Sequence, residues 1–132
     1  MTQTTEAVQQ PALTEAQRSE ALAALVPATA AGMPPTAQTF YAVVKADGTL
    51  ARGFEAVSAT RLGTGMYQVL YAHDITGSAF VGTLGLDVGI GISPSGQIAV
   101  VGRFGAANGV FVQTFDAAGN AADRGFHLAI HS

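Results

Sequence analysis

From Phe40 onward the chain is divided into short runs of β-branched and aromatic residues by turn sequences. The turns include Asp47-Gly48, Asp74 to Gly77 and Ser93 to Gly96, and they recur at intervals of about 8–12 residues. This spacing is typical of antiparallel β-structure and leaves no room for an interior helix. The sequence therefore predicts an all-β fold, an antiparallel β-sandwich that is jelly-roll-like and has about eight strands.

The alternation of side chains predicts which face of each strand enters the core. In the run from Met66 to Tyr71, Tyr67, Val69 and Tyr71 share one face. In the last run Phe126, Leu128 and Ile130 alternate with more polar or smaller residues, so we expect these three to be buried. The expected strands cover residues 40–45, 49–61 with an interruption at Gly53, 66–71, 79–84, 97–101, 110–115 and 126–130.

Residues 1–39 differ in composition from the rest and contain four of the five prolines. The sequence from Thr14 to Gln17 has the form of a capping box, and apolar residues follow it at helical spacing. We expect a short helix from about Glu15 to Val26, ended by Pro27, and then an extended linker. The chain thus divides into an N-terminal arm, residues 1–39, and a β-sandwich domain, residues 40–132.

Only 11% of the residues are charged, whereas 48% are hydrophobic. Soluble domains carry about 25% charged residues, so this chain is short of groups that keep an isolated surface hydrated. The shortage predicts self-association. The candidate interface residues are apolar residues of the expected helix and of the glycine-rich segment 82–92, namely Leu22, Leu25, Val26, Leu86, Val88, Ile90 and Ile92. We expect segment 82–92 to be a loop, although it could instead form a ninth strand.

Several partner classes are disfavoured by the sequence. The six basic residues are scattered, so no basic stripe is expected to bind nucleic acid. No signal peptide and no apolar run of about 20 residues is recognisable, so we expect no membrane span. The localisation therefore stays open: the protein could be cytoplasmic, or it could be associated with a particle or exported by a non-standard route.

The titratable residues suggest no cofactor, metal site or catalytic group. His127 and His131 would lie about 13 Å apart on one strand face, too far to share an ion except through symmetry-related copies on a three-fold axis. Asp74 and Asp116 fall in turns, where their side chains are expected to accept backbone hydrogen bonds. Calcium binding by Asp116, Asn120 and Asp123, and an enzyme built on His73, remain minor alternatives.

A carbohydrate- or small-ligand-binding module is the main alternative function. The chain has no tryptophan, which leaves Tyr41, Tyr67 and Tyr71 as the candidates for stacking on a sugar. An exposed cluster of tyrosines with Asp or Asn at one end of the sandwich would favour this alternative.

The β region resembles a family of small bacterial C-terminal β-sandwich modules found in collagen-like or tail-fibre-like proteins. The similarity lies in residues 41–53, in 62–69 and in the closing stretch from Asn108 to Leu128. It implies a trimeric head or tip domain and brings no catalytic residues. We therefore expect a non-enzymatic structural module of a fibre, particle or surface structure, attached to a larger particle through residues 1–39.

Overall fold

The computed structural model describes residues 10–25 and 39–132, and these form a sandwich of two antiparallel four-stranded sheets with one short helix. The predicted all-β class is confirmed. The first sheet has the order β2-β1-β8-β5 and the second has the order β3-β4-β7-β6. The strands are β1 (Thr39–Val44), β2 (Leu50–Phe54), β3 (Ala56–Gly63), β4 (Met66–Tyr71), β5 (Ala79–Leu84), β6 (Gln97–Gly102), β7 (Gly109–Phe115) and β8 (Phe126–His131).

The core lies between the two sheets and consists of the alternating residues that the sequence predicts. Phe126, Leu128 and Ile130 of β8 are buried against Tyr67 and Val69 of β4. Tyr67 and Phe126 meet edge to face with their ring centroids 5.1 Å apart. The Tyr67 hydroxyl donates to the carbonyl of Ala46 at 2.6 Å, so the polar end of this core residue is satisfied.

The expected strand 49–61 is wrong in one respect, because the chain breaks at Glu55 and not at Gly53. Glu55 has φ 63°, the one non-glycine residue with positive φ among the described residues. The break sends β2 into the first sheet and β3 into the second. A sharp corner of this kind is needed to pass between two sheets, and no local pattern marks Glu55 as its place.

The helix α2 (Glu15–Ala24) begins with the capping box that the sequence predicts. The Thr14 hydroxyl accepts from the Gln17 amide, and the Gln17 side chain accepts from the Thr14 amide, both at 3.0 Å. The helix ends at Ala24, two residues before the expected end. Val26 and the expected linker lie outside the described residues.

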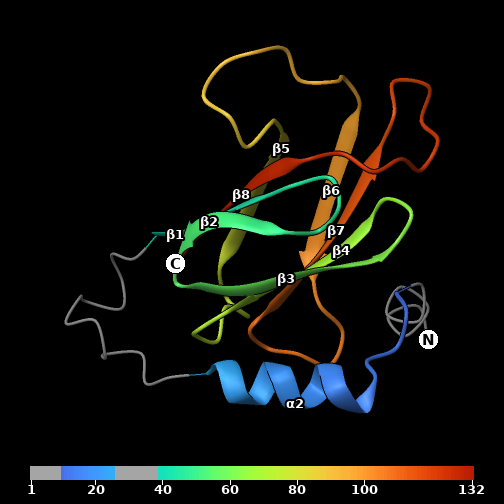
Figure 1. Ribbon diagram of the computed structural model, residues 1–132. Helices are drawn as coiled ribbons and strands as arrows, with labels where there is room; N and C mark the ends of the chain where they lie inside the picture. The colour runs from blue at the N-terminus through green and yellow to red at the C-terminus, as the bar shows by residue number, and fades with distance from the viewer. Residues whose placement is uncertain (1–9, 26–38) are drawn as a thin grey trace.

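Two features stand at opposite ends of the sandwich. The helix α2 lies across one end, and the loop between β5 and β6 projects from the other (Figure 1). The sandwich is also closed along one side, where β5 and β6 approach each other from different sheets. Gly82 allows this approach, because a Cβ atom there would lie 3.0 Å from Val100 and 3.1 Å from Ile98.

Candidate functional site

One continuous segment of the sandwich is almost without charge. Residues 79–102, which form β5, the following loop and β6, contain a single charged residue, Asp87. We call this segment the β5–β6 flank. Because β5 and β6 are both edge strands, the flank includes one outer edge of each sheet.

The flank exposes large apolar side chains along its whole length. Val81 of β5 is 55% exposed and Val101 of β6 is 51% exposed. In the loop, Ile90 and Ile92 are 87% and 92% exposed. Edge strands of monomeric proteins usually carry lysine, proline or an inward-pointing charge that prevents pairing with another sheet, and β5 and β6 have none of these. This surface therefore has the character of an interface.

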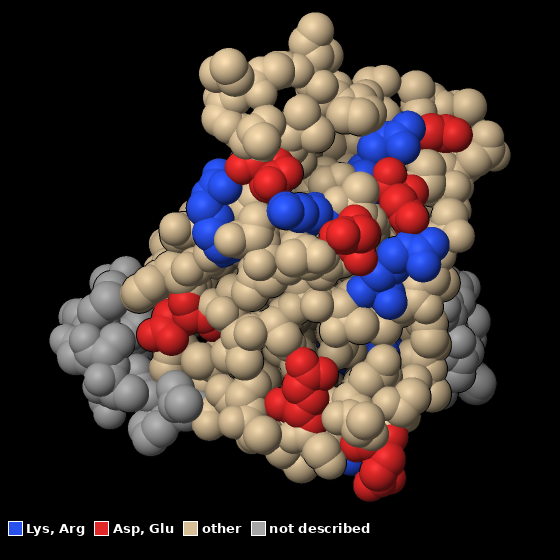
Figure 2. Space-filling view, viewed as in Figure 1, with Lys and Arg blue, Asp and Glu red and all other residues tan. Residues whose placement is uncertain are grey.

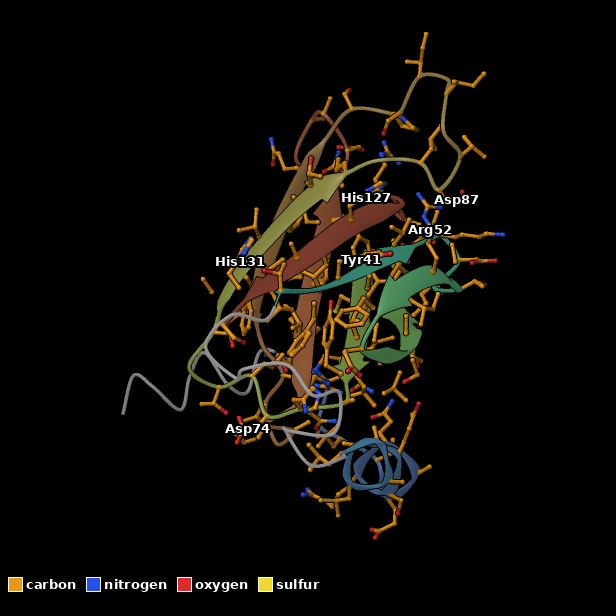
Figure 3. The ribbon with its side chains drawn as sticks, turned by 90° about the vertical axis from the view of Figure 1, so that its left-hand side faces the viewer. Tyr41, Arg52, Asp74, Asp87, His127 and His131 are labelled. Atoms are coloured by element: carbon orange, nitrogen blue, oxygen red, sulfur yellow. The ribbon has the colours of Figure 1, made fainter. Side chains whose placement is uncertain are left out.

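The loop is held at its base by polar contacts from the neighbouring strands. Arg52 donates to the carbonyl of Asp87 at 2.7 Å, and His127 Nε2 lies 2.9 Å from the carbonyl of Leu86. Figure 3 shows Arg52, Asp87 and His127 together where the loop leaves the sandwich. These contacts fix the direction of the loop and leave its apolar tip in solvent. In Figure 2 the tip appears as a projection without coloured side chains, above a band of acidic and basic groups.

The predicted interface residues fall in two separate places. Val88, Ile90 and Ile92 are exposed in the loop, and Leu86 is half-buried at its base. Leu22 and Leu25 are exposed at the helix, at the other end of the molecule, and Val26 lies outside the described residues. No regular strand forms between Leu86 and Ile92, so the segment is a loop and not the ninth strand considered above.

The histidines do not come together. His127 and His131 both point away from the core on β8, and Figure 3 shows them apart with Tyr41 nearby on β1. Within residues 10–25 and 39–132 no three His, Asp or Glu side chains are grouped as metal ligands. His73 is buried and packs on the ring of Phe40, with its Nε2 3.6 Å from a carboxylate oxygen of Glu55. The sequence missed this pair because Glu55 and His73 are brought together by the pairing of β3 with β4, in which the Ala72 amide donates to the Glu55 carbonyl at 2.9 Å.

The turn aspartates accept hydrogen bonds as expected. The hydroxyl and amide of Thr76 donate to Asp74 and lower the pKa of its carboxyl group. The amides of Asn120 and Ala118 donate to Asp116 and lower its pKa in the same way. Asp123 accepts from Arg61 at 2.9 Å and from the Gly65 amide at 2.8 Å. The carboxylates considered for calcium are thus occupied by protein donors.

The tyrosines do not form the exposed cluster that a sugar site would need. Tyr67 and Tyr71 are fully buried, and burial raises the pKa of the Tyr71 hydroxyl. Only Tyr41 is exposed, at 43%. A pocket of about 610 Å³ lies between the β4–β5 connection and the β6–β7 loop. Apolar residues and glycines line most of it, and its polar lining residues are Thr76 and Arg103, of which Arg103 already donates to Gln68, Gln10 and Pro11. Pockets that bind sugars or other small ligands usually add a few converging polar groups to their apolar walls.

Residues 10–25, which we call the docked segment, pack against the sandwich. Two buried polar residues, Arg103 and Asn108, bind this segment and are further functional candidates. Arg103, 4% exposed, donates to the carbonyl of Pro11 at 2.7 Å and to the side chain of Gln10 at 3.1 Å. Asn108, 2% exposed, donates to the carbonyl of Ala21 at 3.1 Å. The sequence missed Arg103 and Asn108, because an isolated Arg and Asn in a loop resemble ordinary solvated residues.

The chain matches no protein-family model, no curated protein and no solved structure. In the part of the chain that the structure describes, no helix has the length and apolar character that a membrane crossing requires.

Proposed function

We propose that the chain is a non-enzymatic assembly module that self-associates as a homotrimer through the β5–β6 flank. In this role it forms part of a fibre, a particle or a surface structure. The observation that carries the proposal is the combination of two unprotected edge strands with the exposed Val81, Val101, Ile90 and Ile92 on one uncharged segment.

The energetics favour burial of this segment between copies. Complete burial of one valine or isoleucine side chain contributes about 1.5–3 kcal/mol relative to exposure in water. The flank carries several such side chains, so burial in a symmetric assembly repeats the gain at every interface. The cost of desolvation is small, because Asp87 is the one charged group in the segment and charged groups are the most costly to bury.

The trimeric state and the attachment to a particle rest on the family resemblance described above. The resemblance to modules of collagen-like and tail-fibre-like proteins supports a head or tip domain. The N-terminal arm, residues 1–39, would then connect the sandwich to the larger particle. Tyr41 is exposed on the same outer face of the first sheet as Val81 and would lie close to the interface.

Charge placed in the flank tests the proposal. We expect the double substitution Val81→Lys with Val101→Lys to convert the oligomer to a monomer, because lysines at an apolar interface would lose their hydration on association. The measurement is mass in solution by light scattering at micromolar concentration. Circular dichroism and a cooperative thermal transition would verify that the variant is folded.

The control is Val57→Lys in β3, where the valine is 46% exposed but lies outside the flank. This variant should retain the mass of the parent protein. A parent protein that is monomeric at micromolar concentration would overturn the proposal. So would a folded flank variant that keeps the oligomeric mass.

A further inference from the structure

We propose that the copies in the assembled protein are joined head to tail, with the loop tip of one copy inserted into the apolar pocket of the next. The loop tip consists of the exposed apolar residues of the β5–β6 loop, Val88, Ile90 and Ile92. The pocket is the cavity of about 610 Å³ between the β4–β5 connection and the β6–β7 loop. This inference rests on the proposed self-association and specifies which surfaces meet.

The symmetry of a homotrimer requires two different contact surfaces on each copy. In a two-fold dimer one patch can pair with itself, whereas a cyclic assembly of three joins one patch of each copy to a different patch of the next. The described residues provide two apolar surfaces of opposite shape, a projecting loop tip and a pocket. The β5–β6 flank contributes to both, because Phe80, Val101 and Gly102 line the pocket.

The two surfaces lie at opposite ends of the same pair of strands. β5 passes the pocket at Phe80 and reaches the loop after Leu84, and β6 returns from the loop at Gln97 to the pocket at Val101. A strand advances about 3.3 Å per residue, so the step from Phe80 to Leu84 spans about 13 Å. The loop also projects away from the end of the sandwich at which the pocket lies (Figure 1). The loop tip of a copy therefore cannot fill the pocket of the same chain, and the symmetry of the trimer supplies the tip of a second copy.

The pocket is suited to an apolar occupant. Ile75, Phe80 and Val101 contribute apolar walls, and Arg103 Nε and Nη1 already donate to Gln68 and to the docked segment. Sites of about 300–1,000 Å³ hold drug-sized molecules, so a pocket of about 610 Å³ has room for isoleucine side chains. Insertion of the loop tip would bury apolar surface on both copies and would bring no charged side chain into the pocket.

The loop tip has the form of an anchor for such a pocket. Ile90 and Ile92 are the two most exposed large hydrophobic residues in the described part of the chain. A single exposed apolar residue on a protein surface is common, but here two isoleucines lie close together on one projection. Interfaces between proteins depend most on a few side chains that fill pockets of the partner, which is the arrangement that these two surfaces allow.

Two variants remove one surface each. The loop variant, Ile90→Ser with Ile92→Ser, removes the apolar tip at highly exposed positions and should fold. The pocket variant, Gly102→Phe, fills the pocket, because Gly102 lines it and a Cβ atom there meets no other atom within 4 Å. We expect each variant alone to lose the oligomeric mass of the parent and to have the mass of one chain by light scattering. Circular dichroism and a cooperative thermal transition would verify that both variants are folded.

A mixture of the two variants tests the direction of the contact. The pocket variant retains an intact loop tip and the loop variant retains an intact pocket, so one contact between them remains possible. We expect the mixture to form a complex of two chains, one of each variant, which neither variant forms alone. The masses would be measured up to concentrations well above that at which the parent is oligomeric, since one contact is weaker than a closed ring of contacts. A contact between two loop tips predicts no such complex.

The matched control for the loop variant is Leu22→Ser with Leu25→Ser. These leucines are also exposed but lie at the helix, so this variant should retain the mass of the parent. The variant Ala107→Lys repeats the pocket test by placing a charge on an exposed part of the pocket wall, and it guards against a folding defect in Gly102→Phe.

The outcomes separate this inference from the proposed function. A parent that is oligomeric, with a folded loop variant or folded pocket variants that keep the oligomeric mass, would overturn the head-to-tail contact while self-association stands. A mixture that contains no complex of two chains would also overturn it. A parent that is monomeric in solution would overturn the proposed function itself, and sedimentation of that monomer with phosphatidylcholine vesicles, lost in the loop variant, would assign the loop tip to a lipid surface.

Discussion

At the scale of single residues, the β3–β4 turn shows how few groups fix a tight connection. Gly65 has φ 66°, and a Cβ atom there would lie 2.5 Å from the carbonyl of Thr114, so glycine is required for both conformation and space. The Gly65 amide donates to Asp123, which also accepts from Arg61. Glycine and aspartate in turns could be predicted from the sequence. The hydrogen bonds of Asp123 with Arg61 and Gly65, some sixty positions earlier, could not be predicted, because they depend on the pairing of β4 with β7.

Asp123 is expected to make the stability of the protein dependent on pH. Burial raises its pKa, but the hydrogen bonds from Gly65 and Arg61 outweigh burial and lower it. A carboxyl group whose folded-state pKa is lowered stabilises the fold above its unfolded pKa of about 3.9, and this contribution is lost as the pH falls through the folded pKa. We expect Asp123→Asn to reduce the free energy of unfolding at pH 7 by about 1 kcal/mol, since the side chain is partly exposed.

Denaturant unfolding at pH 7 and at pH 3 measures this effect. The difference between the parent and Asp123→Asn should shrink at pH 3. Asp87→Asn serves as the control, because Asp87 contacts Arg52 through its backbone carbonyl. A difference for Asp123→Asn that is the same at both pH values would contradict the account.

At the scale of elements, the strands and the helix were predictable to different degrees. The run from Ala79 to Leu84 is a strand with the predicted bounds, because turn residues delimit it on both sides. The strand pair around Glu55 was predicted as one strand interrupted at Gly53, because glycine is the residue that usually marks a bend, whereas the chain turns at Glu55. The capping box of α2 was found from its spacing, but the packing face of the helix was not. The leucines suggested one face, whereas the small residues Ala21 and Ala24 are the ones buried.

Loss of the helix cap should loosen the docked segment without unfolding the sandwich. A helix of ten residues is not stable alone in water, so it depends on its cap and on docking. Thr14→Ala should destabilise the helix by about 1 kcal/mol and increase hydrogen exchange of its amides about fivefold. Thr14→Ser, which retains the hydroxyl, is the matched control.

In Thr14→Ala, amide hydrogen exchange measured by mass spectrometry should become faster in residues 18–25. The exchange rates in β4, β7 and β8 should remain those of the parent protein. Equal acceleration throughout the chain would show that the docked segment and the sandwich unfold as one unit, contrary to the expectation.

At the scale of the whole molecule, charge is distributed unevenly. Acidic and basic groups form a band below the loop in Figure 2, whereas residues 79–102 contain one charged residue, Asp87. The low charge of the chain, visible in its composition, predicted an interface. The sequence alone could not show that β5 and β6 form one surface, because that depends on two edge strands of different sheets closing one side of the sandwich.

An oligomer held by the β5–β6 flank should be insensitive to simple salt. We expect the same mass by light scattering in 0.05 M and 1 M sodium chloride, because screening weakens contacts between charges and leaves apolar contacts intact. Ammonium sulfate should strengthen association, since it favours apolar burial. Dissociation in 1 M sodium chloride would instead assign the interface to the charged band.

The position of β8 between β1 and β5 has a consequence for synthesis on the ribosome. Thr39 near the start of the sandwich pairs with His131 near its end, and β5 also pairs with β8. The first sheet therefore lacks one of its two inner strands, and β5 lacks its partner, while β8 is still inside the exit tunnel. Native packing of the sandwich should therefore be reached only after β8 has left the tunnel, because long-range strand pairing cannot form before both partners are available.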